Sequence, residues 1–362
     1  MEKLMQRVCE EFRIPGEFLS YEEIKMGNVN NTYRVTYRQE DGTPKSYVLQ
    51  KVNTYVFRNP EQVMENIDRV TEHIRAKTPG RIFLHFHHTR DRKNYINDEN
   101  GFWRLFNFIP SVTYNHCEDL EVVRHAGEAF GEFQTMLADF DATLLHETIP
   151  NFHNTVARYD TLLADVQKDP CGKVGEVVEE IEWLMGVKKQ ACALTELYGE
   201  GKLPLRVTHN DTKINNVLFE KEGNQPIAVI DLDTVMPGLI GHDFGDAIRF
   251  AANKVEEDSP DAAQAGVDLD VFREFTEGFL LRTASKLTDT EINTLALSSF
   301  CLTVELATRF LDDYILGSPY FKTNYPEHNL VRARCQIALA KDMLKHMDAM
   351  QAIVNDCVSK YR

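Results

Sequence analysis

The pattern of apolar and polar positions divides the chain into two unlike parts. In the first part, roughly residues 1–110, short apolar runs alternate with turn residues, as in an antiparallel sheet. Val35 and Tyr37 alternate with polar residues, Asp41-Gly42 marks a turn, and residues 47–52 form the returning strand. We expect two further strands at residues 82–86 and 102–106.

One amphipathic helix is expected within this first part. Asn59 is suited to cap its start, Pro60 suits the first helical position, and Glu61 places an acid in the first turn. Apolar residues follow on one side at positions 63, 64, 67, 70 and 74. The sequence Thr78-Pro-Gly80 then ends the helix.

From about residue 118 onward the apolar spacing becomes helical. Long amphipathic stretches cover residues 118–140, 173–199, 268–285, 290–316 and 329–357. One interruption, between about residues 205 and 235, contains a short strand at 217–219, a turn, and a second apolar strand at 227–230. Because strand ends fix side chains more firmly than open loops do, we expect functional residues at this hairpin.

The composition excludes several classes of function. The 362 residues are 43% hydrophobic and 27% charged, as in ordinary globular proteins, and the formal net charge is −16. This charge argues against nucleic-acid or anionic-membrane partners, although backbone N–H groups, one or two cations and a metal ion can still hold a phosphate locally. The longest apolar run, residues 292–304, is shorter than the ~18 residues that span a membrane. Seven scattered cysteines without C-x-x-C spacing, and no signal-peptide pattern, lead us to expect a cytoplasmic protein with reduced thiols.

The hairpin carries the candidate chemistry. His209, Asp211 and Asn216 form an H-x-D-x-x-x-x-N pattern before its first strand, and Asp231 follows its second strand. Phosphoryl transfer needs a carboxylate near the attacking hydroxyl and oxygen ligands for a Mg²⁺ ion that bridges the nucleotide phosphates. Asp211 is the candidate base, and Asn216 and Asp231 are the candidate metal ligands, which antiparallel pairing would bring to one end of the hairpin. The simpler alternative is a turn aspartate, a strand-start cap and a solvated loop residue.

These motifs resemble those of the aminoglycoside phosphotransferase and choline kinase superfamily. More narrowly, the chain resembles bacterial N-acetylhexosamine 1-kinases over nearly its whole length. The runs that carry the narrower resemblance are Thr208-His-Asn-Asp-Thr-Lys-Ile-Asn-Asn-Val217 and Val229-Ile-Asp-Leu-Asp-Thr-Val-Met-Pro-Gly238, with residues 27–35, 48–53, 63–67, 103–109, 152–159, 243–250, 309–314, 320–322 and 328–330.

The resemblance implies a fold and an activity. The fold is α+β and bilobal, as in protein kinases, with a nucleotide-binding lobe at residues 1–109 and a mainly helical catalytic and substrate-binding lobe at 110–362. The activity is ATP- and Mg²⁺-dependent phosphorylation of the anomeric hydroxyl of N-acetylglucosamine or N-acetylgalactosamine. Two alternatives stay open: another hydroxyl acceptor such as an aminoglycoside, choline or homoserine, and a catalytically silent nucleotide- or sugar-binding protein.

The resemblance also assigns nucleotide contacts to a covering loop, the third strand and the crossing between lobes. These contacts are Gly27, Asn28, Thr32, Lys51, Asn107 and Ile109. Asn28 stands where the family often has a histidine. Lys51 would supply the cation for the α- and β-phosphates, with Glu65 as its partner, but a strand shifted by one residue would turn Gln50 to the cleft instead.

Substrate contacts are expected, besides Asp211, from Asp233, Arg309 and Tyr320. Asp233 could instead support the metal ion, and Arg309 could instead form a surface ion pair with Asp312 or Asp313. The run His85-Phe-His-His88 is a rival metal motif. It lacks a cysteine or carboxylate partner at useful spacing and is more typical of a strand that enters a turn.

Overall fold

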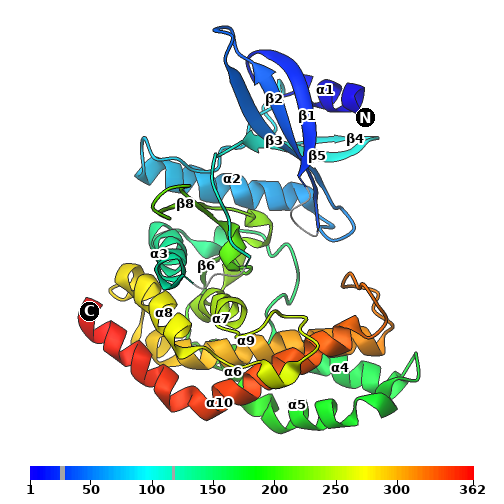
Figure 1. Cartoon of the computed structure of the whole chain (residues 1–362), viewed down its shortest axis with the longest axis vertical. Coiled ribbons are helices and arrows are strands. Elements are labelled where there is room, and N and C mark those ends of the chain that lie inside the picture. Colours follow the sequence, from blue (N-terminus) through cyan, green and yellow to red (C-terminus); the bar gives the residue numbers. More distant parts are fainter. Residues whose placement is uncertain (25–28, 116–118) are drawn as a thin grey trace.

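A computed structural model describes residues 1–24, 29–115 and 119–362. A five-stranded antiparallel sheet with strand order β1-β2-β3-β5-β4 forms the upper part of the molecule in Figure 1. We call this sheet, together with helices α1 and α2, the N-lobe. Its elements are α1 (Glu2–Glu10), β1 (Glu17–Ile24), β2 (Asn31–Arg38), β3 (Pro44–Val52), α2 (Pro60–Lys77), β4 (Ile96–Asp98) and β5 (Gly101–Asn107).

The two faces of this sheet have different neighbours. On one face, Met5 and Val8 of α1 pack with Leu49 and Trp103 in a single apolar cluster. On the other face, Val52 and the apolar side of α2 join a cluster that extends into the second half of the chain. Side chains at alternate positions of β3 and β5 therefore face either α1 or the rest of the molecule.

The expected strand at residues 82–86 is wrong. Within this segment Phe86 alone forms a bridge, to Phe106 of β5. The side chain of Asn107 satisfies the neighbouring backbone, since its Oδ1 accepts from His85 N at 2.7 Å and its Nδ2 donates to Phe83 O at 3.1 Å. In the described residues, backbone pairing with β5 here consists of the bonds from His87 N to Leu105 O and from Asn107 N to His85 O around this bridge. Helix α2 and strands β2, β3 and β5 confirm the other elements expected in this part, although the Asn59 side chain forms no capping hydrogen bond.

The described residues from 110 onward, which we call the C-lobe, are mainly helical, as expected. The interruption seen in the sequence is present: Val217 pairs with Val229 in an antiparallel hairpin of β7 and β8, and Cys192 divides the stretch 173–199 into two helices. The helices are α3 (Leu120–Met136), α4 (Thr155–Lys168), α5 (Val178–Ala191), α6 (Ala193–Gly199), α7 (Ile240–Ala251), α8 (Leu269–Thr283), α9 (Asp289–Ile315) and α10 (His328–Tyr361). The strands are β6 (Arg206–Thr208), β7 (Val217–Phe219), β8 (Pro226–Val229) and β9 (Met236–Gly238), with β6 paired to β9.

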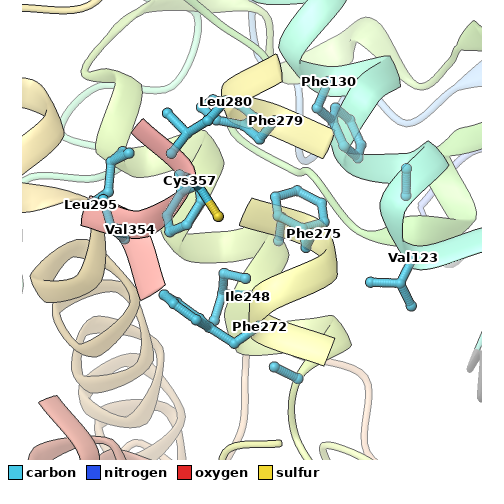
Figure 2. Close-up of a cluster of buried hydrophobic side chains, with 14 of the residues drawn as sticks. Val123, Phe130, Ile248, Phe272, Phe275, Phe279, Leu280, Leu295, Val354 and Cys357 are labelled. Atoms are coloured by element: carbon cyan, nitrogen blue, oxygen red, sulfur yellow. The ribbon is translucent and has the colours of Figure 1, made fainter. Parts of the chain in front are cut away.

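The C-lobe core gathers side chains from α3, α7, α8, α9 and α10. Phe130, Phe275 and Phe279 lie together at the interface of α3 and α8, with Leu295 and Cys357 from the later helices nearby (Figure 2). By length and composition, α9 is apolar enough to cross a membrane, contrary to expectation. However, 78% of its most apolar window is buried inside the protein, as in a core helix. The six cysteines in the described residues are free thiols, as expected.

Candidate active site

Asp211, Asn216 and Asp231 lie at one end of the β7–β8 hairpin. Ile230 N donates to Asn216 O at 2.8 Å, which continues the hairpin pairing to the residue before Asp231. The Asn216 amide nitrogen donates to Asp211 O at 2.7 Å and to Asp211 Oδ2 at 3.2 Å. The structure therefore brings the three residues together, and the Asn216 amide oxygen is the atom that could bind a cation.

Helix α7 holds the loop that carries Asp211. Asp243 accepts from the backbone N–H groups of His209 at 2.9 Å and Asn210 at 2.7 Å, and Asp246 accepts from Thr212 N at 2.9 Å. His209 is fully buried, and its ring links Asp211 N to Ile230 O. With its ring nitrogens committed to these backbone groups, His209 orients the loop.

Asp211 forms an ion pair with Lys213, whose Nζ lies 3.0 Å from Asp211 Oδ1. Burial disfavours the carboxylate, but the charges of Lys213 and His209 outweigh it and hold the pKa of Asp211 below its usual range. Asp211 is therefore ionised at neutral pH, as a proton acceptor must be. Sequence reasoning assigned no role to Lys213, although its place two residues after the candidate base marks it.

Asp231 adopts a left-handed conformation, with φ of +60°, which is uncommon for an aspartate. Desolvation by the surrounding protein and the charges of Asp233 and Asp211 raise the pKa of Asp231 to about 7, although part of its side chain reaches solvent. This excess of negative charge, beside the Asn216 amide, is an oxygen donor set that suits a divalent cation.

Asp233 is buried and is held by the N-lobe. Its carboxylate accepts from Asn30 Nδ2 at 2.7 Å and forms an ion pair with Arg104 of β5. Arg104 Nη2 also donates to Gln50 Oε1 at 2.7 Å, and Gln50 Nε2 donates to Thr32 Oγ1 at 3.0 Å. Thr32 thus lies in the network that reaches Asp233. Both Asp233 oxygens are occupied by the protein itself.

Lys51 does not lie with these residues. It pairs with Trp103 in the sheet register, and its Nζ lies 5.5 Å from the centre of the Trp103 ring, on the α1 side. Gln50, one residue earlier, faces the C-lobe, so the sheet has the alternative strand phase. Glu65 of α2 bonds to His146 Nε2 at 2.7 Å, and the expected pair of Lys51 with Glu65 is not formed.

The remaining nucleotide candidates are placed as follows. Asn107 ends β5, its side chain bonded to residues 83 and 85, and Ile109 is buried two residues later in the crossing to the C-lobe. Gly27 and Asn28 lie outside the described residues.

His85 and His87 stack edge to face, but no group of three or more metal-binding side chains is found in the described ranges.

Arg309 of α9 lies among aromatic rings. Its guanidinium carbon is 5.2 Å from the Phe152 ring centre and 5.5 Å from that of Phe321, and no ion pair to Asp312 or Asp313 occurs in the part of the chain described. Tyr320, beside Phe321, is exposed. Burial and the charge of Arg309 lower the pKa of Arg158, so two arginines lie close together here.

A buried pair joins this region to the Asp211 loop. Glu305, one turn before Arg309 on α9, bonds through Oε1 to His153 Nδ1 at 2.8 Å. The other ring nitrogen of His153 lies 3.2 Å from Asn210 O. The Arg309 region is therefore linked to the backbone next to Asp211 through two side chains.

Two cavities lie near the hairpin. One, of about 60 Å³, is apolar and lies between α2, α3 and β8; none of the predicted site residues lines it, although Leu232, between Asp231 and Asp233, does. The other, of about 220 Å³, is polar and includes Arg249, Glu257 and Arg332 in its lining. Glu257 and Arg249 also act electrostatically on Lys213, so the polar cavity is the one beside the Asp211 loop.

Comparisons with known proteins agree with this fold. The model of a family described as the phosphotransferase enzyme family matches residues 20–275. A microcompartment-associated aminopropanol kinase superposes with a TM-score of 0.64 at 16% identity, covering 95% of this chain and 98% of that chain. An amicoumacin kinase in complex with AMP-PNP, Ca²⁺ and Ami gives 0.63 at 11% identity, covering 93% of each chain. Choline kinase from Cryptosporidium parvum gives 0.56 at 14% identity, covering 99% of each chain. The expected bilobal, kinase-like α+β fold is confirmed.

Proposed function

The chain belongs to the phosphotransferase enzyme family, and on this premise we propose that it transfers the γ-phosphate of ATP to the anomeric hydroxyl of an N-acetylhexosamine. The convergence of Asp211, Asn216 and Asp231 at one end of a hairpin carries the phosphotransfer part of the proposal. The sequence runs 208–217 and 229–238, which resemble those of sugar 1-kinases, support the choice of acceptor.

Asp211 orients the acceptor hydroxyl and takes its proton as the oxygen attacks the γ-phosphorus. An anomeric hydroxyl is more acidic than an ordinary alcohol, so a carboxylate with a lowered pKa is a sufficient base. Lys213, 3.0 Å from Asp211 Oδ1, holds the carboxylate in place and adds positive charge where the transferred phosphoryl group gathers negative charge.

Asn216 and Asp231 are the residues that would hold Mg²⁺. The ion, when bound, neutralises charge on the nucleotide phosphates. Their fit rests on geometry, because the hairpin pairing sets the Asn216 amide and the Asp231 carboxylate at one end of the hairpin, and both offer the oxygen ligands that Mg²⁺ prefers. The fixed position of Asn216 against Asp211 keeps base and metal ligand in one frame.

The side chains around Arg309 bear on the choice of acceptor. Arg309 covers the rings of Phe152 and Phe321, and carboxylates of α9 balance the charges of Arg309 and the neighbouring Arg158. A quaternary ammonium would therefore not find these two aromatic faces free. Arginine and tyrosine donors instead suit sugar hydroxyls and an N-acetyl carbonyl.

An acceptor panel tests this proposal. The purified protein is given radiolabelled ATP, Mg²⁺ and one acceptor at a time: the two N-acetylhexosamines, choline, homoserine and an aminoglycoside. We expect labelled product from at least one N-acetylhexosamine, with kcat/KM at least about a hundredfold above the other three (a difference of about 2.7 kcal/mol in transition-state binding). Preferential labelling of choline, homoserine or the aminoglycoside would refute the sugar assignment and keep the phosphotransferase.

A further inference from the structure

We propose that Asp233 is an anchor between the two lobes, a positioning residue that holds Arg104 and Asn30 and so fixes the N-lobe against the metal-binding end of the hairpin. The proposal rests on the proposed use of a nucleotide and does not depend on the acceptor. It differs from the expectation that Asp233 contacts the substrate.

Asp233 is buried, and each of its carboxylate oxygens already has a partner from the N-lobe side. Its Oδ2 accepts from Asn30, which lies in the segment before β2, and its Oδ1 is paired with Arg104 of β5. The Arg104 and Asp233 side chains are 3% and 4% exposed. A bound sugar would have to displace a buried ion pair to reach this carboxylate.

Asp233 joins the metal-binding end of the hairpin to the N-lobe residues that must lie around a bound nucleotide. Asp233 lies in the short helical turn Leu232–Thr234, and Asp231 is the residue directly before that turn. Asn30 also accepts from Asn53 N at 2.9 Å through its Oδ1, so Asn30 is tied to the end of β3 and to Asp233 at once. Movement of Asp233 would therefore move both the metal-binding turn and the N-lobe residues bonded to it.

Among the described residues, no ion pair between β3 and α2 replaces this connection between the lobes. Lys51 faces the opposite side of the sheet, and Glu65 bonds to His146. The charge that joins the N-lobe to the hairpin comes from β5 through Arg104, which Gln50 of β3 supports by accepting from both Nε at 2.9 Å and Nη2 at 2.7 Å. Gln50 is uncharged, and it fixes the position of the Arg104 guanidinium.

The test compares nucleotide binding with acceptor use in three variants, Asp233→Asn, Arg104→Gln and Asn30→Ala. Calorimetry with Mg²⁺ and ADP, without any acceptor, measures Kd, and steady-state assays give KM for ATP and for the acceptor. We expect Kd for ADP to rise about tenfold or more in Asp233→Asn and Arg104→Gln (about 1.4 kcal/mol) and less in Asn30→Ala. The acceptor KM should stay within about twofold of the parent value at saturating ATP.

Two controls separate positioning from general loss of stability. Arg206→Gln breaks a comparable, largely buried ion pair to Glu291 in the C-lobe and should lower Tm without changing Kd for ADP. The double variant Arg104→Gln/Asp233→Asn leaves no unpaired buried charge, so its Tm should recover towards the parent value while its Kd for ADP stays high. An unchanged Kd in the two single variants, or a raised acceptor KM with normal ADP binding in Asp233→Asn, would overturn the proposal.

Discussion

At the scale of single residues, the neighbours of Asp211 fix the position of its carboxylate and do not raise its basicity. Lys213 and Asn216 hold its two carboxylate oxygens, and its pKa lies below the usual range. A base of this kind contributes by fixing the direction from which the hydroxyl attacks, with proton transfer following as the bond forms.

Replacing Asp211 by Asn should therefore separate turnover from nucleotide binding. Asp211→Asn keeps the shape of the side chain but cannot accept the proton, so we expect kcat to fall by ~10² or more. Kd for ADP in the presence of Mg²⁺, measured by calorimetry, should stay within about threefold of the parent value, because ADP lacks the phosphate that Asp211 serves. Normal kcat in this variant would remove Asp211 from the role of base.

Asp312 predicts a change of stability with pH. Burial, with the charges of Asp165 and Asp313, raises the pKa of this half-buried carboxyl to about 6, so its ionised form costs stability as pH rises through that value. Asp312→Asn should raise Tm by ~2–4 °C at pH 8, for a gain of the order of 1 kcal/mol. Calorimetric scans at pH 8 and pH 4 check the sign: the gain should vanish at pH 4, and an equal gain at both values would contradict the assignment.

The residues of the hairpin could be predicted from sequence because their spacing fixes their geometry. Asn216 precedes one short strand and Asp231 follows the next, so antiparallel pairing leaves little choice. Lys51 could not be placed in the same way. Both faces of β3 carry apolar residues, and the two-residue period of a strand does not say which face meets the C-lobe.

At the scale of elements, α3 and α8 approach so closely that glycines form their interface. A Cβ added at Gly278 would overlap the backbone oxygen of Arg124, and one at Gly127 would overlap that of Phe275. The aromatic cluster of Figure 2 lies along this contact. Helix α3 thereby holds Gln134, which bonds to Asp243 and so supports the Asp211 loop.

Gly278→Ala should accordingly destabilise the protein. The added methyl group meets backbone atoms that cannot rotate away, and overpacking of this kind costs about 1–3 kcal/mol or more. Gly186→Ala is the matched control, because Gly186 lies within α5 with open space around its Cβ position and should gain about 0.5–1 kcal/mol. Urea unfolding of both variants measures the difference, and equal stability of the two would contradict the packing described.

Periodicity predicted the long helices but not the short or fully buried elements. Helix α7 was missed although its apolar and polar residues lie on different sides, because Gly241 and Gly245 within this short helix argue against helix formation. The pair β6–β9 was missed because strands of three residues are too short to show alternation. The segment 82–86 shows a third cause, since its backbone pairs with β5 only around Phe86 and the Asn107 side chain bonds to residues 83 and 85.

At the scale of the whole molecule, the two lobes should be stabilised together by nucleotide and metal. ADP at 100 times its Kd, with Mg²⁺, should stabilise the folded protein by about 2.7 kcal/mol if it binds the native state alone. Differential scanning fluorimetry should show a clear rise in Tm, largely lost on chelation with EDTA. Asp231→Ala should lose the Mg²⁺-dependent part of the shift, and a shift of the same size without Mg²⁺ would contradict the metal role of Asp231.

The proposed function depends on transfer of the phosphate to an anomeric oxygen. Incubation with ATP, Mg²⁺ and N-acetylglucosamine or N-acetylgalactosamine, followed by two-dimensional ¹H–³¹P NMR of the product, tests it most directly. We expect a phosphorus resonance coupled to the proton on C1 of the sugar, and far less of this product from Asp211→Asn in the same incubation time. A phosphate on C6, or no phosphorylation of either sugar by a protein that binds ADP and Mg²⁺, would contradict it.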